Sequence, residues 1–466
     1  MSTLYKVIVV GGGLAGLGAA YELSKDKRYQ VTLLEQRDRI GGRIHALPIA
    51  GQMVDVGGFI VYPWYVEYHR ILKELGLTNQ LKKIPLQAIY YQIDQSGKYY
   101  TQRTIPFPKK DTARLALKLA VPVFQARDVA APPLHSFDYM TGSEFFRDAL
   151  NTKGPAGLYE TYTNVVNQGY CYPSVDRFKM AFMAPFIRMS QFQGDVSDSF
   201  FVRSGNQQVP QALAAVITKA GNSIRTNVIV TGCTSTTAHT NQGDVSGDAI
   251  VFAQNVEPNV YQSILPDIKI KCGYTQYYSV IVELSGSVAV QGDTHWGAAF
   301  YLPDQTPLQI VSAVNLGMLY TPKLAHYLNL NIVVREAETH PQTADQLLPV
   351  LTTQLKKLFP DVTVRTLSQV VYWPMTMPIA DEAFVGTVRA RQGKLGHYFA
   401  GDWLGAPSME AALMTGVRAA QQLIVDTTTT YQPIKSEPLY TRLNNGYTKL
   451  NKRLKNKITP VGGVRR

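Results

Sequence analysis

Two short apolar runs near the N-terminus are separated by a glycine-rich turn and an alanine-rich segment. Val7–Val10 is a β-branched run with no polar interruption, which is the composition of a strand buried on both faces of a parallel sheet. A helix-like segment from Leu17 to Leu23 follows, and a second apolar run occupies Val31–Leu34. This alternation of strand, helix and strand predicts an α/β fold with a parallel sheet.

Glycines at fixed spacing mark the turn after the first strand. In the pattern Gly-x-Gly-x-x-Gly, the first glycine allows a tight turn, the second lets the backbone approach a pyrophosphate, and the third lets helix and strand pack closely. Glu35 stands 19 positions after Gly16, where its carboxylate can accept hydrogen bonds from an adenosine ribose. The pattern predicts a dinucleotide-binding domain of the Rossmann type and leaves NAD and FAD both open; a glycine-rich turn of another α/β protein is the alternative. The candidate cofactor-binding residues of this unit are Gly11, Gly13, Ala15, Gly16 and Glu35.

The next residues carry a resemblance to a known family. Arg39–Arg43 reads Arg-Ile-Gly-Gly-Arg and Val54–Phe59 reads Val-Asp-Val-Gly-Gly-Phe. Both resemble the continuation of the dinucleotide fold in the flavin-containing amine oxidase superfamily, which includes amine oxidases, protoporphyrinogen oxidase and the carotenoid desaturases. Paired glycines let a chain pass close to a flat ring system, and an arginine offers a fixed donor fork to a diphosphate or to the flavin side of the cofactor. The resemblance implies FAD as the cofactor, bound in part by Gly42, Arg43, Gly57, Gly58 and Phe59.

A block near the C-terminus resembles the same family. The apolar run Tyr398–Ala400 leads to Gly401 and Asp402, and a Pro-Ser pair precedes Met409 and suits the start of a helix. We expect this helix to run to about Ile424. By resemblance, Asp402 would bond the ribityl or phosphate region of FAD, and the backbone N–H of Met409 would face the pyrimidine edge of the flavin.

A third block lies between these two. Residues Val209–Lys219 predict a helix, a short strand and a polar hairpin follow, and Asp248–Ala253 is another apolar strand. This order is similar to the middle FAD segment of the family, in which Val228 would place its backbone against adenine. The resemblance covers about half of the chain, in three separated blocks that keep the family's order.

The blocks imply a discontinuous FAD-binding domain of residues 1–84, 201–265 and 371–426. Residues 85–200 and 266–370 are expected to build an α+β substrate domain, and residues 427–466 form a basic tail.

Departures from the family pattern indicate a branch of it. Many amine oxidases carry a lysine on a strand of the substrate domain, where an ungapped placement puts Ser279. They also tend to place an aromatic residue before the Met-Glu pair of the last helix, where this chain has Ser408. The Pro-Ser-Met-Glu run and the prolines around Trp373 look more like those of the carotenoid and phytoene desaturases. We therefore name Trp373 and Ser408 as candidate catalytic residues in the substrate pocket.

The resemblance implies an FAD-dependent oxidoreductase that passes a hydride from a hydrophobic substrate, similar to a polyisoprenoid, carotenoid or porphyrinogen, to flavin N5. An amine or amino-acid oxidase using O₂ is the alternative, and a flavoprotein isomerase or a flavin-binding protein without turnover is a further one. The electron acceptor is open between O₂ and a quinone. No cysteine follows Cys272, which excludes covalent attachment of the flavin through a cysteine in the late region and implies non-covalent FAD.

Aromatic residues and methionines are dense between residues 159 and 189. Such a surface suits a long apolar ligand, although the same composition is also that of a plain hydrophobic core.

The net charge is concentrated at the C-terminal end. Residues 435–466 contain nine basic residues and one acidic residue, so they carry +8 of the formal +12. Apolar positions at helical spacing from Leu439 to Ile458 predict a basic amphipathic helix, which suits an anionic membrane surface or docks on its own domain. Leucines at this spacing serve an apolar contact rather than phosphate tracking, so we expect no nucleic-acid partner.

Three widely spaced cysteines fit neither a disulfide scaffold nor a metal site, and we expect no metal. No apolar window approaches the length of a membrane span, and no signal segment precedes the first strand. We expect a cytoplasmic protein, either free or at the periphery of a membrane.

Overall fold

In the computed structural model of the chain, the two apolar runs near the N-terminus form the neighbouring parallel strands β1 (Tyr5–Val10) and β2 (Tyr29–Leu34). The structure describes residues 4–84, 89–101, 103–125, 128–131, 140–154, 156–172, 174–180, 199–302, 306–335 and 342–428. Residues Met1–Leu423 form one compact unit, and of the second unit, Ile424–Arg466, only residues 424–428 are described.

The Rossmann-type sheet has five parallel strands. Its order is β21-β13-β1-β2-β9, with every pair of neighbours parallel. The strands come from distant parts of the chain, since β9, β13 and β21 span Ser223–Arg225, Ala249–Phe252 and His397–Phe399. The expected α/β class and the expected dinucleotide fold are therefore confirmed.

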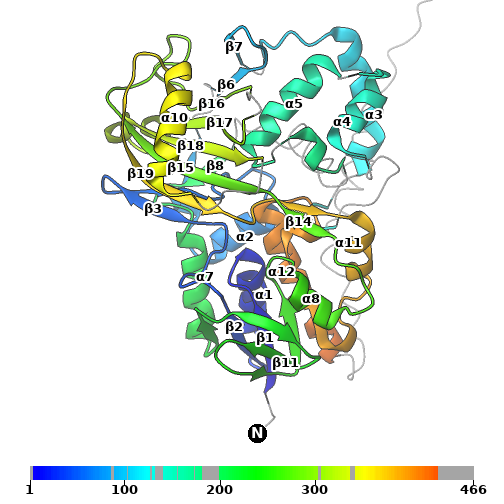
Figure 1. Cartoon of the computed structure of the whole chain (residues 1–466). Coiled ribbons are helices and arrows are strands. Elements are labelled where there is room, and N and C mark those ends of the chain that lie inside the picture. The colour runs from blue at the N-terminus through cyan, green and yellow to red at the C-terminus, as the bar shows by residue number, and fades with distance from the viewer. Residues whose placement is uncertain are drawn as a thin grey trace, which may run out of the picture. The chain divides into compact units, whose positions relative to one another are not determined.

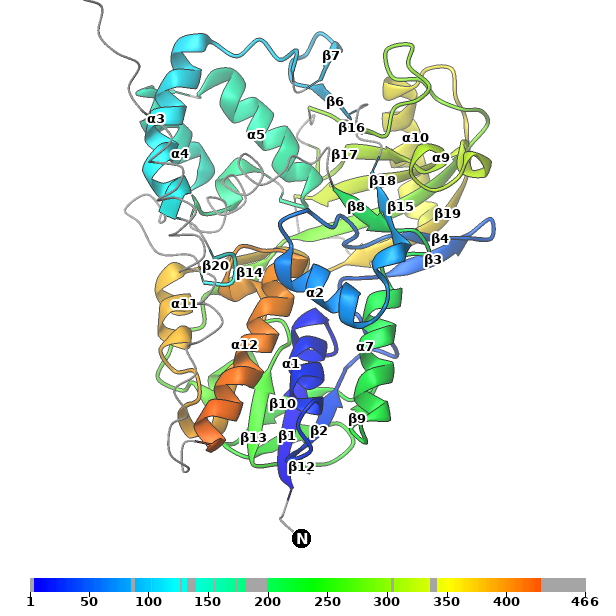
Figure 2. The same ribbon diagram turned by 180° about the vertical axis from the view of Figure 1, so that it is seen from behind.

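Three helices cover one face of this sheet, and close backbone approaches fix their positions (Figure 2). Helix α1 (Leu14–Ser24) packs beside α7 (Gln208–Lys219) and against α12 (Met409–Thr428). A Cβ on Gly16 would lie 1.8 Å from the Gly11 carbonyl oxygen, and one on Gly416 would lie 1.9 Å from the Ala15 carbonyl oxygen. Larger residues at either position would push the helices away from the sheet or from one another.

The opposite face of the parallel sheet is covered by smaller elements. Side chains from this face form a buried cluster with residues of the covering elements, among them Phe252, Tyr261 and Trp403. The covering elements are the antiparallel strands β10 (Val230–Cys233), β11 (Thr237–Thr240) and β12 (Val245–Ser246) and the helices α8 (Pro258–Ile264) and α11 (Glu382–Arg389).

A second sheet has seven strands in the order β19-β15-β18-β17-β16-β6-β7, antiparallel except between β16 and β6. Helix α10 (Ala344–Leu358) packs on one face of it, and α5 (Gly157–Gly169) lies near strands β6, β16 and β17 (Figure 1). The strands are β6 (Ile89–Gln92), β7 (Tyr99–Tyr100), β15 (Gln276–Leu284), β16 (Ala298–Phe300), β17 (Leu308–Asn315), β18 (Tyr327–Val334) and β19 (Val364–Trp373).

Short elements connect the two sheets. The remaining helices are α2 (Val66–Glu74), α3 (Lys109–Gln125), α4 (Gly142–Leu150) and α9 (Leu316–Leu319). Three two-stranded pairs join β3 (Ala46–Ile49) to β4 (Gln52–Asp55), β5 (Leu81–Lys83) to β8 (Phe200–Val202), and β14 (Cys272–Tyr274) to β20 (Pro378–Ala380).

The expected domain boundary after residue 370 falls inside strand β19, which continues to Trp373 within the seven-stranded sheet. Within the described residues, the helix that begins at Met409 extends to Thr428, beyond the expected end near Ile424. The expected amphipathic helix of the basic tail, residues 435–466, lies outside the described residues.

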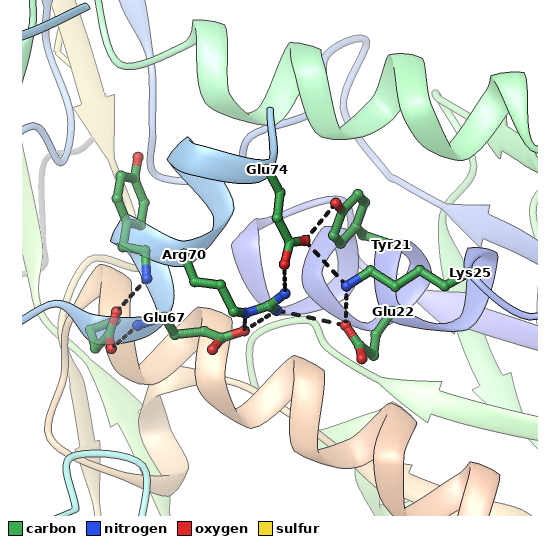
Figure 3. Close-up of polar contacts among 8 residues, drawn as sticks. Tyr21, Glu22, Lys25, Glu67, Arg70 and Glu74 are labelled. Atoms are coloured by element: carbon green, nitrogen blue, oxygen red, sulfur yellow. Dashed lines mark hydrogen bonds and ion pairs between the residues drawn. The ribbon is translucent and has the colours of Figure 1, made fainter. Parts of the chain in front are cut away.

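An ion-pair network joins α2 to the exposed side of α1 (Figure 3). The Arg70 guanidinium lies against three carboxylates: it pairs with Glu67, with Glu74 at 2.5 Å, and with Glu22 of α1 at 3.6 Å. Lys25 pairs with Glu22 at 2.9 Å and with Glu74 at 3.2 Å. Because one arginine separates three acidic groups, its removal would leave them repelling one another.

We expect Arg70→Met to lower the free energy of unfolding by roughly 1 to 2 kcal/mol, more than an isolated exposed pair contributes. The loss should be larger at low salt, where carboxylate repulsion is least screened. Urea unfolding at low and high salt measures it. Arg28→Met, which removes an exposed pair with Asp26 and a contact with the Tyr29 ring, is the control and should change less. If both substitutions lowered the free energy of unfolding equally, the proposed stabilising role of the Arg70 network would be wrong.

Candidate functional site

One continuous cavity of about 630 Å³ lies between the carboxyl ends of the parallel strands and one face of the seven-stranded sheet. All but one of the site residues expected from the sequence line it, and the exception, Gly16, serves packing. Those lining the cavity are Gly11, Gly13, Ala15, Glu35, Gly42, Arg43, Gly57, Gly58, Phe59, Val228, Trp373, Gly401, Asp402, Ser408 and Met409.

At the end of the cavity formed by β1 and β2, the backbone is shaped by glycine. Gly11 has a φ of +105°, a conformation that side chains rarely allow. Gly13 caps α1 without any side-chain hydrogen bond to the first-turn N–H groups. Those N–H groups are therefore available to an anion such as a phosphate.

Glu35 ends β2 beside this turn and is almost fully buried. Its carboxylate accepts hydrogen bonds from the N–H of Gly12 at 2.6 Å and from the N–H of Arg37 at 2.9 Å. The carboxylate is thereby held at the cavity wall, where the sequence pattern places a ribose partner.

Arginines gather next to Glu35. The guanidinium groups of Arg37 and Arg39 lie 5.5 Å and 5.8 Å from the ring centre of Trp373. Burial, and to a smaller extent repulsion from the charge of Arg37, lowers the pKa of Arg39 to about 10. Because these cations repel one another, an anionic ligand bound beside them would be attracted by the whole cluster.

Arg43 and Asp402 face each other further along the cavity. Arg43 donates to Asp402 at 2.5 Å and also to the carbonyl oxygen of Thr376. Burial works against the charge of Arg43, but the Asp402 carboxylate raises the pKa of the arginine. This pair connects the N-terminal block to the loop before α12.

Asn206 links four segments under the cavity floor. Its N–H donates to the Asp55 carboxylate at 2.8 Å, and its side-chain amide donates to the Gly58 carbonyl oxygen at 2.9 Å and to Met409 Sδ at 3.2 Å. Its amide oxygen accepts from the Tyr68 hydroxyl at 2.6 Å. One buried side chain thus fixes the position of the Gly57-Gly58 turn relative to α2 and α12.

Two buried carboxyl groups complete this network. Asp55 also accepts from the Tyr320 hydroxyl at 3.0 Å, and burial raises the pKa of Asp55 to about 7. Glu410 accepts from the N–H groups of Glu67 and Tyr68 at 2.7 Å and 2.9 Å, so it caps α2, and burial raises its pKa to about 8.

The remaining part of the cavity is apolar and aromatic. Tyr62 and Tyr170 share a hydrogen bond, and Tyr91 stacks on Phe300 with ring centres 5.4 Å apart. Of the aromatic and methionine residues expected between 159 and 189, those described and lining the cavity are Tyr162, Tyr170, Phe178 and Met180. Tyr172 packs in a core cluster with Tyr159 at its edge, while Phe182, Met183, Phe186 and Met189 lie outside the described residues.

The two candidate catalytic residues have clear structural partners. Trp373 donates its indole N–H to the Val56 carbonyl oxygen at 3.1 Å and lies against the arginines of the nucleotide end. Ser408 accepts from the Ala411 N–H at 3.0 Å and donates to the Ala406 carbonyl oxygen at 3.0 Å, so it caps α12. Both line the cavity, and their participation in catalysis stays a prediction.

Sequence reasoning missed Asn206, Asp55 and Glu410 as structural residues of the site. Asp55 and Glu410 lie inside motifs that the sequence analysis recognised, and their charge within apolar surroundings was the available signal. Asn206 gave no signal, because its partners come from residues 55, 58, 68 and 409.

The residues present fit FAD. The open N-terminus of α1 suits the diphosphate, Glu35 suits the adenosine ribose, and the glycines at 57 and 58 leave room for a flat ring. The side-chain oxygen of Gln254, which lines the cavity after β13, is buried without a hydrogen-bond partner in the protein. An exocyclic amine or hydroxyl of a dinucleotide would satisfy it.

Comparison with known proteins agrees with this geometry. The family model described as flavin containing amine oxidoreductase matches residues 14–424. Amine oxidase B of Mus musculus is 31% identical over 176 residues, which is 35% of this chain and 33% of that protein. The matched segments span about a fifth to a third of the first curated relatives.

Two solved structures show a similar fold. The fatty acid isomerase of P. acnes that produces CLA has a TM-score of 0.70 and 14% identity, covering 93% of this chain and all of that one. The cyclohexylamine oxidase of Brevibacterium oxydans has a TM-score of 0.64 and 17% identity, covering 91% of this chain and all of that one. At these identities the likeness concerns the fold alone.

Two further findings concern only the described part of the chain. No helix there is both long and apolar enough to span a bilayer. No group of three or more His, Cys, Asp or Glu side chains in the same ranges is arranged to hold a metal ion.

Gly13→Ala tests the placement of the cofactor. The φ of Gly13 is −76°, and an added Cβ would meet nothing closer than the Cα of Gly42 at 3.8 Å, so the fold should tolerate it. The methyl group would occupy the space for the pyrophosphate, and we expect FAD affinity of the apoprotein to fall at least about tenfold. Gly386→Ala, in an open position of α11, is the control. Titration with FAD measures both, and unchanged affinity in Gly13→Ala would place the diphosphate elsewhere.

Asp55→Asn tests the buried network through pH. Because the folded pKa is raised above the unfolded value, the folded state binds the extra proton, and stability falls as pH rises from about 4 to about 7. The slope is at most about 1.4 kcal/mol per pH unit.

The asparagine cannot titrate, so its unfolding free energy should fall less steeply over this window in urea denaturation of the flavin-loaded protein. The exposed carboxylate of Asp361 offers the control Asp361→Asn, which should follow the wild type. If Asp55→Asn kept the wild-type slope, Asp55 would not be the titrating group.

Proposed function

The chain belongs to the flavin-containing amine oxidoreductase family and is an FAD-dependent oxidoreductase; on that premise, we propose that its substrate is a neutral and predominantly apolar molecule. The resemblance to the desaturase and protoporphyrinogen oxidase branch supports a polyisoprenoid-like or porphyrinogen-like compound.

The composition of the cavity carries the proposal. Among its described lining residues, the charged ones are Glu35, Arg37, Arg43, Glu257 and Asp402. Glu35 and Arg37 belong to the nucleotide end, Glu257 follows β13, and Arg43 and Asp402 neutralise each other. Among the described lining residues of the sheet and of α5, none is charged. An isolated charge on the substrate would lose its hydration there without gaining a partner.

The protein residues bind, orient and keep the site dry. The stacked pair Tyr91 and Phe300 and the hydrogen-bonded pair Tyr62 and Tyr170 present rigid aromatic surfaces to a substrate. The described lining contains no lysine or histidine, so no protein base of those kinds acts from it. Bound FAD supplies the hydride acceptor, and the chain's part is to hold the substrate C–H in position and exclude water.

Oxidation of an amine is the second candidate, favoured by the amine oxidases among the curated relatives. Tyrosine faces such as those of Tyr62 and Tyr65 can attract an ammonium group. An isomerase is the third, supported by the neighbour that acts on a fatty acid.

Anaerobic mixing of the oxidised holoprotein with candidate substrates separates these functions. We expect neutral isoprenoid or porphyrinogen compounds to bleach the oxidised flavin absorption band, and primary amines to leave it unchanged. Bleaching by amines with peroxide release in air would contradict the proposal. Conversion of a substrate without any net bleaching would favour the isomerase.

A further inference from the structure

Four polar side chains interrupt the apolar face of the sheet that borders the cavity: Ser279, Ser312, Asn329 and Asn331. We propose that this polar row is a subsite for one uncharged hydroxyl or carbonyl group of the substrate. The inference rests on the proposed function and specifies the substrate further, as an apolar body with a single neutral polar group.

Strand register places the row on one level of the sheet. Ser279 of β15 stands opposite Asn331 of β18, and Asn331 stands opposite Ser312 of β17. Residues directly opposite in neighbouring strands share a face. The three side chains therefore cross three adjacent strands in a line, and Asn329, two residues before Asn331, lies on the same face.

A β-bulge brings Ser312 into this row. The partner of Ile332 is Ile310, so regular pairing would set Val311 opposite Asn331, but the register shifts and Ser312 takes that place. A bulge adds one residue and re-aims the side chains after it. Without it, a valine would face the cavity beside Asn331, and the row would lose its third member.

Hydrogen bonds hold the row and leave part of its capacity for a ligand. Ser279 donates to Asn329 at 2.8 Å, Asn329 donates to the Asp55 carbonyl oxygen at 3.2 Å, and Asn331 donates to Ser312 at 2.7 Å. An asparagine amide has a second N–H and an acceptor oxygen, and a serine that accepts one bond still has a proton to donate. Ser312 is fully buried, whereas the half-buried Asn331 amide can still give one hydrogen bond and accept another.

The surroundings select an uncharged group. The flanking cavity residues on the same sheet are apolar or aromatic, namely Tyr277, Ala298, Phe300 and Val314. Among the described residues of this sheet that line the cavity, no carboxylate would balance an ammonium group, and no lysine or arginine would balance a carboxylate. A hydroxyl or carbonyl exchanges its water for the amide and hydroxyl of the row at little net cost.

Calorimetric titration of the oxidised holoprotein with a matched set of probes tests the subsite. The probes are cyclohexane, cyclohexanol, cyclohexylammonium and cyclohexanecarboxylate. In the wild type we expect cyclohexanol to bind more tightly than either charged probe. Asn331→Leu keeps the volume and removes the polar group, so cyclohexanol should bind about threefold to tenfold more weakly and cyclohexane at least as tightly.

Two further variants keep the test decisive. Ser312→Ala serves in place of Asn331→Leu if that variant fails to fold. It removes the hydroxyl that accepts the Asn331 amide hydrogen bond, and it should also weaken the binding of cyclohexanol selectively. Leu330→Met, on the opposite face of β18 in the core cluster under α10, should leave all four affinities unchanged. Melting temperature and flavin content confirm that each variant is intact.

Equal losses for cyclohexane and cyclohexanol in the row variants, or tighter binding of a charged probe by the wild type, would overturn the subsite. The titrations, done without O₂, measure binding and not flavin reduction, so their outcome is distinguishable from that of the test of the proposed function. If cyclohexanol bound selectively but neutral substrates did not bleach the flavin, the proposed function would be contradicted and the subsite would stand.

Discussion

The hydrogen bonds of Asn206 and Asp55 hold the site together, because they join segments that the chain supplies from five distant regions. Asn206 bonds the turn at Gly58 and the start of α12 at Met409, while Asp55 bonds Tyr320 and, through its carbonyl oxygen, Asn329. Asp55 and Asn206 are buried, Gly58, Met409 and Asn329 line the cavity, and Tyr320 is half-buried. Loss of either side chain would leave several buried polar groups unsatisfied, which costs more than any one bond contributes.

This network ties the nucleotide end to the substrate end. Asp55 lies one residue before the Val56-Gly57-Gly58 turn and also contacts the strand that bears Asn329. The floor of the substrate cavity and the glycine turn therefore share one anchor. A substrate group bound on the sheet and a flavin bound over the glycines would be held by the same buried framework, which suits a reaction that depends on orientation more than on protein acids or bases.

The local parts of this site were predictable from sequence, because they depend on neighbours along the chain. Glycine spacing gave the turn after β1, and the distance to Glu35 identified the end of β2, as observed. The parts formed by long-range contacts were not predictable. Asn206 meets partners up to 203 positions away, and the polar row depends on a bulge at Val311 that no composition signals. The serine at 408 was noted for its difference from amine oxidases, and its helix-capping bonds come from residues close by.

The described lining on the substrate side of the cavity holds no charged group, and we propose that it receives a neutral, largely apolar molecule. The most direct measurement is to extract the purified protein and identify by mass the non-flavin compound that copurifies with it. We expect a neutral apolar compound with a single hydroxyl or carbonyl group, alongside FAD. A small polar amine in its place would contradict the account.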